Sequence, residues 1–196
     1  MSKDIQGTGD VVRLKQSLGE LPEPVTRPFL VLVGGLPATG KSFFSRRLAQ
    51  RYPAVVLESD VLRRALVHHP TYSWQESRRL FRVCERLVED FLSKGFSVIL
   101  DATNLKAVHR DLFYQAAERS GARVVVVWVE APPTLVWARL SARQQGLDPN
   151  DKSEADWAVY TRMRKTAEPP FRNFFRVNTA RDIGPAIERV VKALKS

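Results

Sequence analysis

The sequence predicts an α/β fold in which helices cover both faces of a five-stranded, mainly parallel sheet. Short apolar runs alternate with helical patterns along the chain, and the runs are apolar at successive positions, as in strands that are covered on both faces. The strands are expected at residues 29–33, 54–57, 96–100, 123–129 and 174–177. The helices between and after them are expected at residues 42–50, 61–67, 74–93, 107–120, 133–143, 154–166 and 183–194.

Residues 1–27 differ in pattern from the rest of the chain. Asp10 is placed to cap a short helix over residues 11–18, which a glycine then ends. The prolines that follow indicate an extended linker: Pro22, Pro24 and Pro28. We therefore expect an N-terminal extension with a proline-rich linker over residues 1–27, followed by a single domain over residues 28–196.

Length and composition narrow the class of protein. With 196 residues, 44% of them apolar, the chain fits one domain with a sizeable core. No apolar run approaches the roughly 18 residues of a membrane span, and residues 1–9 lack the apolar stretch of a signal peptide. The single cysteine, Cys84, cannot form an internal disulfide framework and is expected to be a buried apolar residue. These features predict a cytoplasmic protein that does not contact a membrane.

The charge balance is strongly basic. The chain has 31 Lys and Arg against 21 Asp and Glu, a formal net charge of +10. This excess favours anionic partners such as nucleotides or nucleic acid, although a merely soluble basic protein can have the same composition. It leaves the oligomeric state open.

A complete G-x-x-x-x-G-K-S motif follows the first strand pattern and opens the first helix of the domain. Its residues are Gly35, Leu36, Pro37, Ala38, Thr39, Gly40, Lys41 and Ser42. Glycines let the backbone curl with its N–H groups around a phosphate, and the helix adds the positive end of its dipole. Lys41 is expected to reach the β- and γ-phosphates of a nucleoside triphosphate, and the Ser42 hydroxyl to ligate Mg²⁺. The motif therefore predicts the P-loop NTPase fold.

A second acidic position follows the third strand. Asp101 ends a buried strand, and ligands of doubly wound sheets bind at the carboxyl ends of the strands. We expect Asp101 to hold Mg²⁺ opposite Ser42, directly or through water. The alternative is an aspartate in a strand-end turn. Thr103 and Asn104 are expected to turn the chain and to contact substrate.

A candidate base follows the second strand. Asp60 and Arg63 are three residues apart, so they share one side of the first turn of a helix. The carboxylate could accept the proton of an attacking hydroxyl, and the arginine could bind a phosphate of the acceptor. Asp60 would alternatively serve only as the helix N-cap, in which case Glu58 is the substitute base.

Two arginines four residues apart suggest a lid. Arg139 and Arg143 lie on the helix expected at 133–143, which Gly146 and Pro149 interrupt. A lid over about residues 139–152 would bring arginine to the charge that develops on the transferred phosphoryl group. The alternative is a solvated basic helix face.

A further row of basic residues lies on the helix expected at 74–93. Its members are Arg78, Arg82 and Arg86. Acidic residues within helical pairing distance favour a salt-bridged surface for this row. They are Glu85, Glu89 and Asp90.

Together the motifs resemble the P-loop kinases related to the phage-type polynucleotide 5′-hydroxyl kinase. This group includes zeta-toxin-like and small-molecule kinases, and many members are labelled AAA-type ATP-binding proteins. The resemblance covers about residues 29–196 and rests on four features: the P-loop, Ser59-Asp60-x-x-Arg63, Asp101-Ala-Thr-Asn104 and the helix with Arg139 and Arg143.

The resemblance implies a role for each matching position. Lys41 and Ser42 would hold ATP and Mg²⁺, with Asp101 supporting the metal. Asp60 would be the general base, and Arg63 would contact a phosphate of the acceptor. Arg143, or Arg139 as the second candidate, would contact the triphosphate from the lid.

The sequence thus predicts an ATP-dependent kinase that phosphorylates an acceptor hydroxyl. A polynucleotide 5′-hydroxyl at a DNA or RNA end is favoured, because Asp60 and Arg63 suit a hydroxyl beside a phosphate and the basic excess attracts a polyanion. Aromatic residues that could stack on bases are Tyr72, Trp74 and Trp157. The alternatives are a kinase of a small sugar, nucleoside or antibiotic, and an NTP hydrolase or nucleotide-dependent switch.

Overall fold

A single parallel sheet organises the protein. The computed structural model describes residues 2–145, 155–171 and 173–195. The strands are β1 (Phe29–Gly34), β2 (Val55–Glu58), β3 (Val98–Asp101), β4 (Arg123–Glu130) and β5 (Phe174–Asn178). They lie in the order β2-β3-β1-β4-β5, and every pairing between neighbours is parallel. The predicted five-stranded α/β fold is therefore confirmed.

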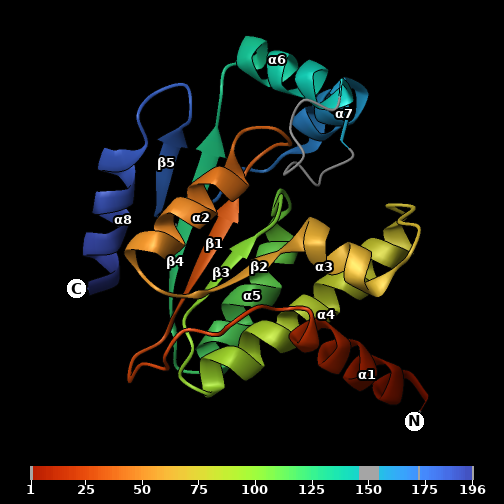
Figure 1. The fold of residues 1–196 in the computed structure, drawn as a ribbon, viewed down its shortest axis with the longest axis vertical. Helices are drawn as coiled ribbons and strands as arrows, with labels where there is room; N and C mark the ends of the chain where they lie inside the picture. Colours follow the sequence, from red (N-terminus) through yellow and green to blue (C-terminus); the bar gives the residue numbers. More distant parts are fainter. Residues whose placement is uncertain (1, 146–154, 172, 196) are drawn as a thin grey trace.

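Helices cover both faces of the sheet (Figure 1). They are α1 (Ser2–Gln16), α2 (Lys41–Arg51), α3 (Ser59–Leu66), α4 (Trp74–Ser93), α5 (Ala107–Arg119), α6 (Pro133–Gln144), α7 (Trp157–Thr166) and α8 (Gly184–Lys195). Val31 and Val33 of β1 belong to the core formed with α2 and α8. Leu30 and Leu32 belong to the core formed with α4 and α5. This alternation explains why the strand is apolar throughout, since both of its faces are buried.

Helices α6 and α7 stand above the carboxyl end of the sheet (Figure 1). Val136 and Leu140 of α6 pack with Tyr160 of α7 in a small cluster of buried side chains. Leu36 and Ala38 of the P-loop pack against the same cluster. The two helices are therefore in contact with the P-loop, in the place where a lid was predicted. Residues 146–152 of the predicted lid lie outside the described residues.

The N-terminal helix is longer than predicted and packs against the main core. It begins at Ser2 rather than at residue 11, so Asp10 lies inside the helix and is not its cap. The Asp10 carboxylate accepts hydrogen bonds of 2.8 and 2.7 Å from the Arg79 guanidinium on α4. Leu14 is fully buried in the core shared with α4 and α5. Tertiary contacts, which local sequence pattern does not reveal, place this helix.

Two expectations about single residues and segments can be compared with the structure. Cys84 is buried at 1% exposure, and burial raises the pKa of its thiol to about 12. It is therefore the buried apolar residue that was expected. Among the described residues, none of the helices combines the length and apolar character that a membrane crossing requires.

Candidate active site

The P-loop follows β1 directly, and its two invariant motif positions need glycine. Gly35 has φ of 146°, and a Cβ there would lie 2.2 Å from the carbonyl oxygen of Val129. Gly40 has φ of 93° and immediately precedes α2. The Thr39 hydroxyl donates a 2.8 Å hydrogen bond to the carbonyl of Leu36, which closes the loop on itself. The backbone therefore adopts the tight curve that phosphate binding by N–H groups requires.

Lys41 is the first residue of α2 and folds back over the loop. Its ammonium group donates a 2.9 Å hydrogen bond to the carbonyl oxygen of Leu36. The positive charge thus stands beside the helix N-terminus, where the dipole also favours an anion. A triphosphate bound in the loop would contact both the ammonium group and the N-terminus of α2.

Asp101 lies next to the P-loop because β3 pairs with β1, with Val33 opposite Asp101. The carboxyl group is 3% exposed and hydrogen bonds with the Ser42 hydroxyl. Burial raises its pKa, with a further contribution from Asp60, while Lys41 and the Ser42 hydrogen bond act in the opposite direction.

The donor set around Asp101 fits Mg²⁺. Within the described residues, one carboxylate oxygen of Asp101 is buried without a hydrogen-bond partner. It lies beside a hydroxyl, and Mg²⁺ prefers oxygen ligands, keeping several waters and taking others from phosphates. Ser42 and Asp101 would therefore hold the ion between them.

Asp60 lies within the first turn of α3, on the side of the sheet edge that carries Asp101. Strands β2 and β3 place Glu58 opposite Asp101, and the charge of Asp60 is close enough to influence the pKa of Asp101. Glu58, not Asp60, occupies the N-cap position of α3. The interpretation of Asp60 as only an N-cap is therefore wrong. Glu58 instead forms an ion pair with Arg46 at 3.8 Å.

Arg63 does not join Asp60 at the sheet edge. It is 7% exposed and forms a buried ion pair with Glu76 of α4. Its guanidinium also lies 4.6 Å from the centre of the Tyr72 ring. Burial acts to raise the pKa of Glu76, but hydrogen bonds from Arg63 and Thr71 outweigh burial, so that its pKa is lowered. The arginine predicted to bind an acceptor phosphate is therefore already paired within the protein.

Arg139 of α6 contacts the P-loop. Its guanidinium donates hydrogen bonds to the carbonyl of Ala38 at 3.1 Å, and to the hydroxyl and carbonyl oxygens of Thr179 at 3.0 and 3.3 Å. Burial lowers its pKa. Arg143 instead donates to the carbonyl of Ala155 at 2.9 Å, before α7. The geometry therefore places Arg139 against the P-loop.

Thr179 was not singled out by the sequence, although it holds the loop and the arginine together. Its hydroxyl donates a 2.7 Å hydrogen bond to the carbonyl of Thr39 while accepting one from Arg139. A Cβ on Gly40 would lie only 3.0 Å from the methyl carbon of Thr179, so this methyl group also leaves no room for a side chain there. The only sequence signal was its position after the last strand, which is typical of many residues without this role.

Thr103 contacts the P-loop through its main chain, and Asn104 contacts β1 through its side chain. The carbonyl of Thr103 accepts a 2.9 Å hydrogen bond from the N–H of Gly35. The Asn104 side chain is 1% exposed and donates to the carbonyl of Val33 at 2.9 Å. These contacts position the loop, and the amide of Asn104 faces the protein interior rather than a substrate.

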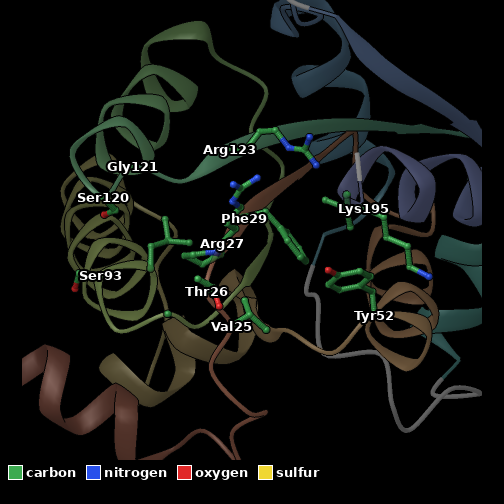
Figure 2. A pocket seen from close by; sticks show the side chains of 14 residues that line it. Val25, Thr26, Arg27, Phe29, Tyr52, Ser93, Ser120, Gly121, Arg123 and Lys195 are labelled. Carbon is green, nitrogen blue, oxygen red and sulfur yellow. The ribbon is translucent and has the colours of Figure 1, made fainter.

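A cavity of about 850 Å³ lies at the opposite edge of the sheet, where the strands begin (Figure 2). Helix ends border it at Tyr52, Ser93, Ser120 and Lys195. These are carboxyl ends with a partial negative charge, which the cavity's basic residues complement. Arg123, for example, donates a hydrogen bond to the carbonyl of Ala193 near the end of α8. This arrangement does not suit a triphosphate, so the candidate site remains at the carboxyl edge.

Comparison with known proteins identifies the family. The sequence model of a family described as AAA domain matches residues 30–170, which include the P-loop, Asp60, Asp101 and Arg139. The chain belongs to the AAA domain family. Within the match lie all the residues that the structure gathers at the carboxyl edge except Thr179.

Relatives of this AAA domain protein include several kinases. It is 28% identical over 124 residues to an L-seryl-tRNA(Sec) kinase from Methanococcus maripaludis. The matched region covers 62% of this chain and 48% of the relative. The chain thus spans about half the length of that curated relative. Its fold resembles an APS kinase from Mycobacterium tuberculosis solved with AMPPNP and APS (TM-score 0.66, 20% identity, 87% and 99% of the two chains covered).

A gluconokinase from Sinorhizobium meliloti is a further structural neighbour of the AAA domain protein. The TM-score is 0.59 at 16% identity, with 86% of this chain and 96% of the neighbour covered. At these identities the structural matches establish the fold. Taken with the family, the relatives support an ATP-dependent phosphotransferase.

Proposed function

We propose that the protein is an ATP-dependent kinase that transfers the γ-phosphoryl group to an acceptor hydroxyl. The observation that carries the proposal is the grouping of Lys41, Ser42, Asp101 and Asp60 at one edge of the sheet. A phosphate-binding loop and a metal-binding carboxylate are sufficient for binding or hydrolysing a nucleotide. A second carboxylate beside them, Asp60, is what a hydroxyl acceptor additionally requires.

Each residue has a defined part in this reaction. Lys41 and the N-terminus of α2 bind the β- and γ-phosphates. Ser42 and Asp101 would hold Mg²⁺, which would supply further neutralisation of the triphosphate charge. Asp60 accepts the proton of the acceptor hydroxyl while the hydroxyl oxygen bonds to the γ-phosphorus. The bond from that phosphorus to the β–γ bridging oxygen breaks, and ADP leaves. Arg139 neutralises charge on the transferring group.

A polynucleotide 5′-hydroxyl is the first proposed acceptor. The net charge of +10 favours a polyanion. Exposed aromatic side chains lie next to α3, with Tyr72 40% and Trp74 71% exposed. The name of one relative, an L-seryl-tRNA(Sec) kinase, also denotes a hydroxyl carried on a nucleic acid. None of the relatives described above is a polynucleotide 5′-hydroxyl kinase, so the family resemblance alone does not select this acceptor.

A small hydroxyl compound is the second candidate, and the ion pair of Arg63 with Glu76 favours it. Because Glu76 already neutralises Arg63, the surroundings of Asp60 attract a phosphate less than the sequence suggested. An acceptor without a phosphate, such as a sugar, does not need that attraction. The name of the gluconokinase neighbour denotes a sugar-derived acceptor on the same fold.

A transfer assay tests the proposal and separates the acceptors. ATP labelled at the γ-phosphate is offered with Mg²⁺ and either 5′-hydroxyl DNA and RNA oligonucleotides or a panel of sugars, nucleosides and aminoglycosides. Label on an oligonucleotide 5′ end supports the first acceptor. Label on a small compound alone supports the second and rejects the first. Release of labelled inorganic phosphate at the same rate with and without every acceptor would instead indicate a hydrolase.

A further inference from the structure

One face of α4 carries an ordered row of exposed side chains. The row consists of Trp74, Arg78, Arg82 and Arg86, and all of them are exposed. Residues four apart on an α-helix lie on the same side, about 6 Å apart along the axis. The three arginines therefore follow one another at nearly regular spacing from the exposed tryptophan. The row begins at the end of α4 that adjoins α3, the helix of Asp60 (Figure 1).

The acidic residues near this row pair with basic residues of neighbouring elements and of α4 itself. Glu85 and Glu89 accept hydrogen bonds from Arg119 of α5 at 3.0 and 2.9 Å. Asp90 pairs with Lys15 of α1 at 2.5 Å and with Lys94 at 3.0 Å. These ion pairs agree with the salt-bridged surface that the sequence predicted, and their basic partners lie outside the row. Three carboxylates thus face the three arginines of the row and three further basic side chains, so the net charge of this surface is positive.

Aromatic rings stand at the end of the row nearest the proposed base. The guanidinium of Arg78 lies 5.1 Å from the centre of the Trp74 ring. Tyr72, over Arg63, has φ of 53°, a left-handed conformation that is costly for a tyrosine. Backbone strain of this kind persists where the surrounding structure holds it, often at ligand-binding sites. The rings offer flat, solvent-exposed surfaces beside α3.

We propose that the α4 row is a docking surface for single-stranded nucleic acid. The arginines bind successive phosphates, because their spacing is comparable with that of phosphates in an extended single strand. A base near the 5′ end stacks on Trp74, which directs the 5′ terminus toward Asp60. Stacking surfaces combined with a basic track are the usual means of binding single strands without reading sequence. The inference rests on the proposed kinase function for its purpose, but binding can be measured without transfer.

The first test is the binding of a fluorescently labelled single-stranded oligonucleotide, measured by anisotropy. The salt concentration is varied from about 50 to 200 mM, a range over which counterion release changes the affinity. Arg82→Gln is expected to weaken binding several-fold and to reduce the slope of log K against log salt by about 0.7. The matched control is Arg189→Gln, which removes the same charge from an exposed site on α8, across the sheet. It should leave both quantities at the parent value.

The second test concerns stacking. Trp74→Ala is expected to weaken oligonucleotide binding by about 5- to 150-fold, the range for loss of one base–aromatic stack. Its control is Trp137→Ala on α6, since Trp137 is also exposed, at 56%. Polyphosphate, a polyanion without bases, serves as the competing ligand. Its binding should depend on Arg82 and not on Trp74.

The outcomes separate this inference from the proposed function. If the row variants weaken oligonucleotide binding and the controls do not, the docking surface stands, even when no label reaches a 5′-hydroxyl. The absence of transfer to a 5′-hydroxyl would reject only the polynucleotide acceptor. If Arg82→Gln and Arg189→Gln have equal effects, or Trp74→Ala has none, the docking surface is rejected. Transfer to a small compound would then leave the kinase function intact.

Discussion

At the scale of single residues, Asp60 shows how the position of a carboxylate within a helix decides which role it can have. Glu58 occupies the N-cap of α3, and Asp60 follows it within the first turn. Its side chain is only partly buried and influences the pKa of Asp101 nearby. A carboxylate not used for capping, beside a metal-binding carboxylate, is available to an incoming hydroxyl.

The substitution Asp60→Asn tests this role. We expect transfer to fall by roughly 10²–10⁴, the usual contribution of a general base, while ATP binding stays within a few-fold of the parent. The measurements are single-turnover transfer and ATP affinity. Glu58→Gln is the matched control, because Glu58 pairs with Arg46 beside the same strand end. Loss of activity in the control alone would transfer the base assignment to Glu58.

Lys41 is the second residue whose loss is decisive. We expect Lys41→Ala to abolish phosphoryl transfer, because the β- and γ-phosphates lose the point charge that neutralises them. Its ammonium group donates to the Leu36 carbonyl within the loop, so we expect the variant to stay folded. Circular dichroism and thermal unfolding check the fold, and labelled-ATP transfer checks activity. Near-parental turnover in a folded sample would reject the P-loop assignment.

At the scale of elements, Arg139 connects α6 to the P-loop. We expect Arg139→Ala to lower kcat more than it raises KM for ATP, the pattern of a contact that matters most in the transition state. Arg143→Ala is the comparison, because the Arg143 guanidinium donates to the carbonyl of Ala155. Steady-state kinetics of both variants measure the difference. A larger loss of kcat in Arg143→Ala would restore the order predicted from the sequence.

Thr179 links the turn after β5 to both α6 and the P-loop. Thr179→Val keeps the shape of the side chain but removes the hydroxyl that bonds to Thr39 and Arg139. We expect a reduced kcat in Thr179→Val and recovery of most of it in Thr179→Ser. The KM for ATP and the melting temperature provide the control readouts. If valine and serine variants behave alike, the hydroxyl has no positioning role.

At the scale of the whole molecule, the N-terminal segment shares its core with the domain. Leu14 of α1 is fully buried, whereas Val12 on the same helix is 51% exposed. We expect Leu14→Ala to reduce the free energy of unfolding by about 2–5 kcal/mol, and Val12→Ala by no more than about 0.5 kcal/mol. Denaturant unfolding of the full chain measures both. Equal, small effects would mean that α1 is the separate extension predicted from the sequence.

Much of the fold could be predicted from the sequence because it depends on local pattern. Continuous apolar runs separated by helical periodicity determine a covered parallel sheet, and the P-loop motif fixes where phosphate binds. The glycines at 35 and 40 are recognisable for the same reason, since their backbone angles exclude other residues. Residues adjoining strand ends, such as Asp101, follow from the rule that ligands meet the carboxyl edge.

Only the tertiary structure decided which partner each charged side chain takes. Arg63 could be assigned to an acceptor phosphate until the fold placed Glu76 against it, and Asp10 to a helix cap until it met Arg79. Arg139 and Arg143 are equivalent by spacing, yet only the packing of α6 over the P-loop brings one of them to Ala38. The sequence by itself determined the strands, the helices after residue 28 and the phosphate-binding loop, because these depend on neighbours a few residues apart. Pairing between distant charges depends on how the elements pack, which local sequence does not encode.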